Sequence, residues 1–355
     1  MPIHAAILPP VFNGSSMNSP PKVLPMKLSR LIVTTSLLIA LTAIAHAAGA
    51  YRVTHTWQLG VSGGWDYLTM DSATHTLYIA QGDKVLLFDT KSNTVAATIP
   101  GLGRTHGIVL STDGKTVYVA DSATGKVHII DHASLKETGS ISVGAGADSM
   151  VIEPVTGHLF VFCGKSKEAD VLDLATNTVV AQIPLPGRPE FPAADGVGGV
   201  YDNMEDLHQL VHIDAAQNKI IGSVTFDGCE GPSGQAIDRA TMRAFSVCDN
   251  GRMVITELPR LKQIGMVTIG EGPDAAVFDP AQKLIFSSNG DVGTLSIVHE
   301  ISPKQFELEQ TVKTATRGRT LALDRDSGAI YIVAPDPAAA ADVKSKPLLL
   351  IEVSR

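Results

Sequence analysis

The amino-acid sequence predicts an all-β protein, a seven-bladed β-propeller whose last blade is completed by an N-terminal strand. The chain of 355 residues contains 32 Gly and 20 Pro, only 18% of it is charged, and short runs rich in Val and Ile are frequent. This composition is typical of turn-rich β structure. One aromatic residue recurs in such runs at spacings of 40 to 45 residues, which indicates propeller blades. The series consists of Tyr78, Tyr118, Phe160, Tyr201, Phe245, Phe286 and Tyr331.

Each repeat also carries an acidic residue that closes an apolar run, so two features share one period. These residues are Asp89, Asp131, Asp173, Asp214, Glu257, Glu300 and Glu352. We therefore divide each unit into four short strands, with the aromatic residue in the second and the acid at the end of the third. Polar turns such as residues 90–93 follow the acids, where a carboxylate can accept hydrogen bonds from backbone N–H groups. We expect a structural role, because carboxylates repeated at the outer turn of every blade cannot converge on one substrate.

The two ends of the propeller sequence supply the ring closure. The last repeat stops after its third strand, at residues 348–353, whereas residues 51–59 precede the first repeat and have no partner within it. We expect these segments to pair in one blade, which removes the exposed strand edges of an open array. The expected propeller is a single domain that runs from residue 48 to residue 355.

The N-terminal segment has the pattern of an export signal. Lys27 and Arg30 precede an apolar stretch of 15 residues, and residues 45–47 form a small-x-small cleavage site. The stretch is shorter than the roughly 20 residues that a membrane helix needs, so we expect cleavage rather than anchoring. Residues 26–47 are the expected signal peptide, and residues 1–25 are an extension expected to be non-native or disordered. The mature protein is expected to be periplasmic or secreted.

The mature chain would be acidic, with 25 basic and 36 acidic residues. An acidic surface repels phosphate backbones, and no basic stripe with interleaved aromatic residues offsets it. We therefore expect no nucleic-acid partner and no membrane span after cleavage. The expected form is a monomer whose partner is a small molecule or a periplasmic protein.

The second repeat contains Tyr-Val-Ala-Asp at residues 118–121, and Gly-Pro or Gly-Arg-Pro precedes the first strand of several units. In this repeat pattern, residues 51–355 resemble the bacterial YVTN family of β-propellers, also called YncE-like. The resemblance implies the propeller fold and export. It implies no reaction, since related propellers include lactonases, lyases and quinoprotein subunits.

Polar residues just before the first strand of each blade are the candidate ligand-binding residues, because these positions converge on the mouth of the central channel. They are Asp66, Arg104, His106, Asp148, Glu190, Asp274, Arg317 and Arg319. One imidazole and four carboxylates can hold a divalent cation such as Ca²⁺, Mg²⁺ or Mn²⁺, or supply a general base. Two other interpretations stay open: a plain solvated rim, or pairing of Asp66 and Asp274 with arginines. No catalytic residue is assigned, because no motif for a nucleophile, a phosphate loop or a zinc site occurs.

The cysteines predict one disulfide bond. In an oxidising compartment Cys229, in the loop that enters blade five, and Cys248, at the end of the next strand, are expected to lie on one face and to pair. Cys163 occupies, in blade three, the position that Cys248 occupies in blade five, and it is expected to be a free thiol. The alternative of three unpaired thiols stays open.

Two functions are compatible with these patterns. The regular repeat and the lack of a catalytic motif favour a binding or scaffold protein that presents its channel mouth to a ligand. The alternative is a metal-dependent enzyme of the lactonase or lyase type that uses His106 and the neighbouring carboxylates. An insertion in blade seven, between residues 336 and 346, is expected to stand beside the mouth as a lid or docking loop.

Overall fold

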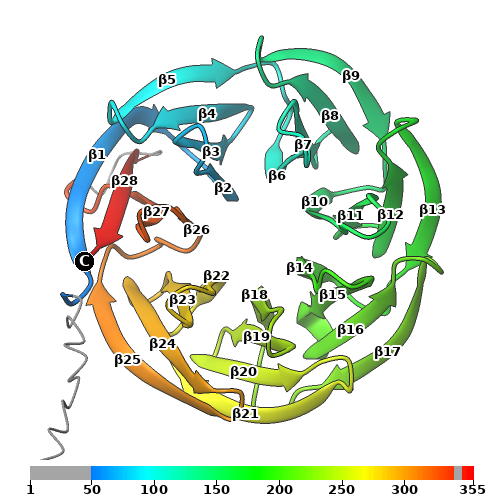
Figure 1. Ribbon diagram of the computed structural model, residues 1–355. Coiled ribbons are helices and arrows are strands. Elements are labelled where there is room, and N and C mark those ends of the chain that lie inside the picture. Colours follow the sequence, from blue (N-terminus) through cyan, green and yellow to red (C-terminus); the bar gives the residue numbers. More distant parts are fainter. Residues whose placement is uncertain (1–48, 340–345) are drawn as a thin grey trace, which may run out of the picture. The chain divides into compact units, whose positions relative to one another are not determined.

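A computed structural model describes residues 49–339 and 346–355. This part of the chain folds into seven four-stranded sheets arranged as a ring around a central channel (Figure 1). The predicted fold class is therefore confirmed. The predicted extension and signal peptide, residues 1–25 and 26–47, lie outside the described residues. Among the described residues, no helix has the length and apolar character needed to cross a membrane.

Each sheet is one blade, and its four strands run from the channel to the outside of the ring. The first strands, which surround the channel, are β2 (Leu68–Asp71), β6 (Thr105–Leu110), β10 (Ala147–Ile152), β14 (Pro189–Ala194), β18 (Pro232–Asp238), β22 (Pro273–Asp279) and β26 (Leu321–Leu323). The second strands are β3 (Thr76–Gln81), β7 (Thr116–Asp121), β11 (Leu159–Cys163), β15 (Gly199–Met204), β19 (Arg243–Cys248), β23 (Leu284–Asn289) and β27 (Ile330–Pro335). The third strands are β4 (Lys84–Asp89), β8 (Lys126–Asp131), β12 (Glu168–Asp173), β16 (Gln209–Asp214), β20 (Arg252–Glu257), β24 (Thr294–Ser302) and β28 (Pro347–Ser354). The outer strands are β5 (Thr94–Ile99), β9 (Lys136–Ser142), β13 (Thr178–Pro184), β17 (Lys219–Thr225), β21 (Lys262–Thr268), β25 (Gln305–Lys313) and β1 (Arg52–Ser62), and a short 3-10 helix, η1 (Glu205–Leu207), follows β15.

The hydrophobic core lies between neighbouring blades. The second and third strands are covered on both faces, so they read as continuous apolar runs and are almost entirely buried, whereas the outer strands alternate between exposed and half-buried residues. The recurring aromatic residue fills this interface. Tyr78, for example, is fully buried and packs in one cluster with Val117 and Val119 of the next blade.

The recurring acid fixes a turn in most blades. Asp89 accepts a hydrogen bond from the backbone N–H of Lys91 at 2.7 Å, and Asp214 accepts one from Gln217 at 2.9 Å. The turn then closes through a left-handed asparagine, Asn93 or Asn218, a conformation that asparagine tolerates better than most residues. These acids do not reach the channel and are structural, as their position in the repeat predicts.

Ring closure occurs through β1, which pairs antiparallel with β28, with Trp57 opposite Leu350. The strand extends to Ser62, three residues beyond the predicted segment. Tyr51, just before β1, also reaches the neighbouring blade, because its backbone exchanges hydrogen bonds with the side chain of Gln310 at 3.0 and 2.6 Å. Its ring packs edge-on against Phe286 with centroids 5.3 Å apart. The seam is therefore held within blade seven and across its contact with blade six.

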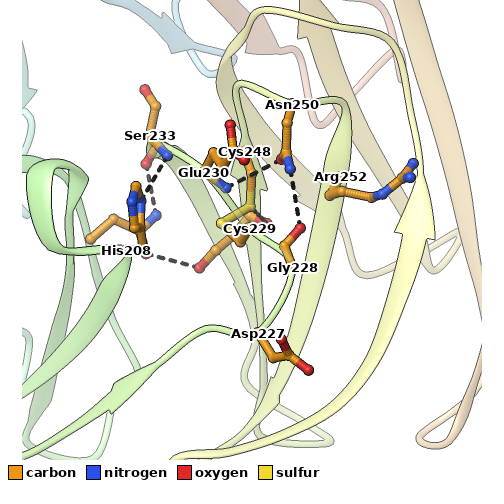
Figure 2. The surroundings of a disulfide bond; sticks show 12 residues. His208, Asp227, Gly228, Cys229, Glu230, Ser233, Cys248, Asn250 and Arg252 are labelled. Carbon is orange, nitrogen blue, oxygen red and sulfur yellow. Dashed lines mark hydrogen bonds between the residues drawn. A yellow bond between two sulfur atoms is a disulfide. The ribbon is translucent and has the colours of Figure 1, made fainter.

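A disulfide bond joins Cys229 to Cys248, with their Cα atoms 5.5 Å apart (Figure 2). Around it, Asn250 donates to the carbonyl of Gly228 at 3.2 Å and accepts from the N–H of Glu230 at 3.3 Å. The disulfide and these hydrogen bonds fix the loop that leads into β18. Cys163 is a buried free thiol, and burial together with the charge of Asp170 raises its pKa, which keeps it protonated and unreactive.

Deletion of residues 51–59 is expected to abolish cooperative unfolding, because blade seven loses its outer strand and exposes two unpaired edges. Thermal unfolding followed by circular dichroism measures this. A deletion variant that melts sharply near the wild-type temperature contradicts the closure described above.

Digestion of the non-reduced, alkylated protein is expected to yield one linked peptide pair that contains Cys229 and Cys248, with Cys163 alkylated only after unfolding. A closed loop of this length stabilises the fold by roughly 3 kcal/mol in the chain-entropy model, so reduction should lower the melting temperature. Recovery of Cys163 in a disulfide, or of three alkylated cysteines, would rule the pairing out.

Candidate functional site

A cavity of about 610 Å³ lies at the end of the channel where the first strands begin. We call it the mouth cavity. All the residues predicted at the channel mouth line it, namely Asp66, Arg104, His106, Asp148, Glu190, Asp274, Arg317 and Arg319.

A shared backbone feature places these side chains. His106, Asp148, Glu190, Ser233 and Asp274 are each the second residue of a first strand. In all five of those strands the pairing with the second strand shifts directly at or after this residue. Such irregularities bend a strand and redirect a side chain. The repeat therefore delivers one side chain per blade to the channel axis.

Asp66, His106 and Asp148 form the most compact group in the mouth cavity. Their ligand atoms all lie within 4.8 Å of one another. His106 Nδ1 is 3.1 Å from Asp148 Oδ1 and in direct contact with Asp66 Oδ2. Gly107 permits this approach of β6 to β10, because an added Cβ there would lie 2.6 Å from the carbonyl oxygen of Asp148.

His106 is buried and electrostatically unusual. Neither of its ring nitrogens has a hydrogen bond of ordinary geometry to any described residue. Burial opposes a positive charge on the ring, but the carboxylates of Asp148 and Asp66 outweigh it and raise the pKa of His106 to about 9. Two carboxylates thus converge on Nδ1 of one imidazole, whose Nε2 has no partner among the described residues.

This donor set fits a divalent cation. Two carboxylates and one imidazole can replace several water ligands of a bound cation, and the ion would satisfy the unpaired ring nitrogen and both acids together. Imidazole suits Mn²⁺ and other transition metals better than Ca²⁺, which prefers oxygen ligands alone. A cation would have to displace the proton of His106, so its affinity should rise with pH.

Asp121 holds the loop that carries Arg104 and His106. Its buried carboxylate accepts hydrogen bonds from the backbone N–H groups of Gly103 and Arg104 at 2.8 and 2.9 Å. His128 lies 3.2 Å from the same carboxylate. Burial opposes the charge, but these hydrogen bonds prevail and hold the pKa of Asp121 below its usual range. Asp121 is thus a positioning residue, which the sequence does not reveal as part of the site.

The opposite wall of the mouth cavity carries arginine–carboxylate pairs. Arg188 is 3.1 Å from Glu190 and also contacts Glu205 of η1. Arg319 pairs with Asp274 at 3.3 Å, which is the pairing that the sequence left open. Asp66 pairs with His106 instead of Arg104.

Two arginines at the mouth remain available for a ligand. Arg104 and Arg317 line the cavity and make no ion pair with a described residue. The guanidinium of Arg317 lies over the ring of Trp65, 6.0 Å from its centroid. These two groups can therefore contact an electron-rich oxygen of a bound molecule without breaking an existing ion pair.

Mutual repulsion and burial keep some mouth carboxyls protonated. Burial, followed by the charge of Asp148, raises the pKa of Glu190 to about 8, although Arg188 opposes the shift. Burial raises the pKa of Asp274 to about 6 against the pull of Arg319. Asp202 lies fully buried behind Glu190, and burial raises its pKa well above the usual range. The mouth therefore holds protons at neutral pH that ordinary carboxyls would release.

The sequence missed several cavity residues, namely Tyr67, Arg188, Phe191, Glu205, Asp249 and Asp291. Tyr67, Arg188 and Phe191 lie within two positions of a predicted residue. The other three follow second strands. The loops that leave the second strands lie on the same face of the propeller as the loops that enter the first strands, so this rule could have found them. The insertion in blade seven lies partly outside the described residues, and its role as a lid stays a prediction. Its described start, residues 336–339, does not line the mouth cavity.

Comparison with known proteins connects part of the chain to esterases. The sequence model of the family Arylesterase matches residues 57–179. Serum paraoxonase/lactonase 3 of Homo sapiens is 33% identical over 82 residues, which are 22% of this chain and 23% of that protein. The chain thus aligns with less than a quarter of this relative. Residues 57–179, which the Arylesterase model matches, contain Asp66, His106 and Asp148.

Solved structures support the fold. Hydrazine synthase of Kuenenia stuttgartiensis superposes with a TM-score of 0.66 at 16% identity, covering 75% of this chain and 91% of that one. A chain of the mitotic checkpoint complex superposes with a TM-score of 0.70 at 15% identity, covering 94% of this chain and 99% of that one. At these identities the likeness concerns the fold alone. Together the comparisons show that the chain is a β-propeller protein.

The metal-free protein is expected to lose stability as pH rises from about 5 to about 8. The pKa of Glu190 is about 8 in the folded state and near 4.5 in the unfolded state, so between these values the folded state holds a proton that the unfolded state has released. Glu190→Gln should remove part of this dependence and gain on the order of 2 kcal/mol over wild type at pH 9.

Urea unfolding of chelator-treated protein at several pH values tests this expectation. Glu271→Gln is the matched control, because Glu271 is exposed and does not line the mouth cavity. Parallel stability profiles for wild type and Glu190→Gln would show that Glu190 does not carry the effect.

Proposed function

We propose that the protein is a hydrolase that cleaves lactones or other carboxylic esters in its mouth cavity with the aid of a divalent cation. The observation that carries the proposal is the group formed by Asp66, His106 and Asp148, in which two carboxylates converge on one buried imidazole. The Arylesterase match supports it, since all three residues lie within residues 57–179, the segment that the family model matches. The repeat regularity that favoured a pure binding role is equally compatible with an enzyme, because the blades supply only the scaffold.

Asp66, His106 and Asp148 would hold the cation. When bound, it would polarise the carbonyl of the ester and make water more acidic. The cavity volume of about 610 Å³ suits a small organic substrate. Arg104 and Arg317, which have no ion pair with a described residue, would orient the carbonyl and the developing negative charge.

Glu190 is the residue best suited to exchange a proton with water or with the leaving alcohol. It faces the same cavity, and its pKa of about 8 lies near neutral pH, where a general acid or base is most effective. Arg188 fixes the carboxyl at 3.1 Å. A bound cation would compensate the charge of Asp148 and so lower the pKa of Glu190.

The remaining features belong to the same proposal. The signal pattern of residues 26–47 and the Cys229–Cys248 disulfide support a periplasmic or secreted location. The repeat pattern supports kinship with YVTN, or YncE-like, propellers. The substrate is proposed to be a free small molecule, with the chain acting as a monomer.

Asp148→Asn is expected to lower kcat/KM for an aryl acetate or a simple lactone at least 100-fold and to reduce cation affinity, because the amide weakens the ligand set without changing its shape. Activity should vanish after chelation and return with Mn²⁺ or another divalent ion, with a rise in melting temperature on binding. Asp83→Asn, on an exposed turn outside the mouth cavity, is the matched control. Absence of turnover with any of these ions, together with no stoichiometric cation and no thermal stabilisation, would refute the proposal.

A further inference from the structure

A second cavity, of about 780 Å³, lies at the opposite end of the channel, where the first strands of blades three to six end. We call it the lower cavity. Its wall is mainly apolar and is formed by Val151, Ala193, Ala236, Val277 and Phe278, among others. The combination of a large apolar volume with few polar groups is typical of a ligand site.

An aromatic pair lies where the two cavities adjoin. Phe191 lines both of them, and its ring lies against that of Tyr67 with centroids 5.2 Å apart. The hydroxyl of Tyr67 donates to the carbonyl of Glu190 at 3.0 Å, which fixes the ring across the channel. The lower cavity therefore meets the mouth cavity at Phe191, while the rest of its lining is different.

Gln235, one of the residues that line the lower cavity, carries an unsatisfied acceptor. Its side chain lines the lower cavity and is only 2% exposed. The amide nitrogen donates to the carbonyls of Tyr201 at 2.9 Å and Phe191 at 3.2 Å, which sets the orientation of the amide. The amide oxygen has no partner among the described residues. A buried acceptor of this kind is costly unless a donor, such as a ligand hydroxyl, reaches it.

Two arginines give the rim of the lower cavity a positive charge. Arg325 makes no ion pair with a described residue, and Arg239 uses only its Nε, which donates to the carbonyl of Ala194 at 3.0 Å. One acid, Asp238, also lies at the rim and accepts hydrogen bonds from Ala240 and Thr241 at 2.9 and 2.7 Å, so two cationic groups face a single carboxylate. The rim can therefore receive an anion.

We propose that the lower cavity binds an aliphatic hydroxy acid, with the carboxylate at Arg239 and Arg325, the hydrocarbon chain along the apolar wall, and the hydroxyl on the amide oxygen of Gln235. Charge complementarity selects a carboxylate over a neutral or cationic amphiphile. The unpaired acceptor selects a hydroxylated chain over a plain fatty acid. This site needs neither the cation nor the residues of the mouth cavity.

Calorimetric titration of the chelator-treated protein with 10-hydroxydecanoate tests the proposal, and because no cation is present its outcome is independent of the proposed hydrolysis. We expect one molecule to bind per chain. Decanoate, which lacks the hydroxyl, and 1,10-decanediol, which lacks the carboxylate, should each bind about tenfold more weakly or worse.

Variants distinguish binding in the lower cavity from unspecific binding elsewhere on the protein. The double substitution Arg239→Gln with Arg325→Gln should weaken 10-hydroxydecanoate at least tenfold, and Ala193→Phe should abolish binding by filling the cavity. Arg260→Gln is the control for the type of substitution, because it removes one positive charge from an exposed turn that does not line the cavity. The Asp148→Asn variant should bind 10-hydroxydecanoate as wild type does.

Lack of saturable binding of 10-hydroxydecanoate to the wild type would overturn the site. So would binding as tight as that of wild type by both the arginine double variant and Ala193→Phe. Decanoate or decanediol binding as tightly as 10-hydroxydecanoate would overturn the assigned ligand class. Since Arg239 and Arg325 are exposed, their substitution should leave the melting temperature unchanged, so the binding result can be interpreted even if Ala193→Phe folds poorly.

Discussion

The pairing of β1 with β28 is the constraint on which the rest of the structure depends. A propeller blade contacts only its neighbours, so the radius of the ring is defined only when the last blade meets the first. Tyr51 strengthens the seam through Gln310 and Phe286 of blade six. On the channel side, Thr320 of blade seven donates to the carbonyl of Asp66 in blade one at 2.8 Å. The mouth cavity includes residues from both sides of this seam, so the site exists only in the closed ring.

Most of the candidate site is formed by one position of the repeat, which contributes one side chain from each blade. The same irregularity in strand pairing turns the second residue of most first strands toward the axis, while the rest of each blade forms apolar interfaces. Chemistry can therefore vary at this position without disturbing the core. Blade two supplies an imidazole there, blades three, four and six supply carboxylates, and blade five supplies the hydroxyl of Ser233.

The periodicity was sufficient to predict the fold, the ring closure and the position of the mouth residues within each repeat, because each follows from counting residues along the repeat. It could not predict which of these side chains meet. Asp66 contacts His106 because Gly107 lets two first strands approach and because Asp121 fixes the loop before β6. Both effects depend on backbone contacts between segments distant in sequence. The lower cavity was missed for a related reason: its apolar lining has the same pattern as a buried core.

The channel has two chemical environments, which meet at Tyr67 and Phe191. At the mouth, seven acidic residues and four arginines line the cavity, so burial and the neighbouring acids raise the pKa of Glu190 and a cation is electrostatically favoured. Beyond the pair, apolar side chains of the first strands line most of the space, and Arg239, Arg325 and Asp238 lie at its rim. The same strands thus contribute acids to the mouth cavity and mainly apolar side chains to the lower cavity. Because Phe191 lines both cavities and Tyr67 is hydrogen-bonded to the carbonyl of Glu190, this pair links the acidic site to the apolar wall, and a change in either ring should be felt on both sides.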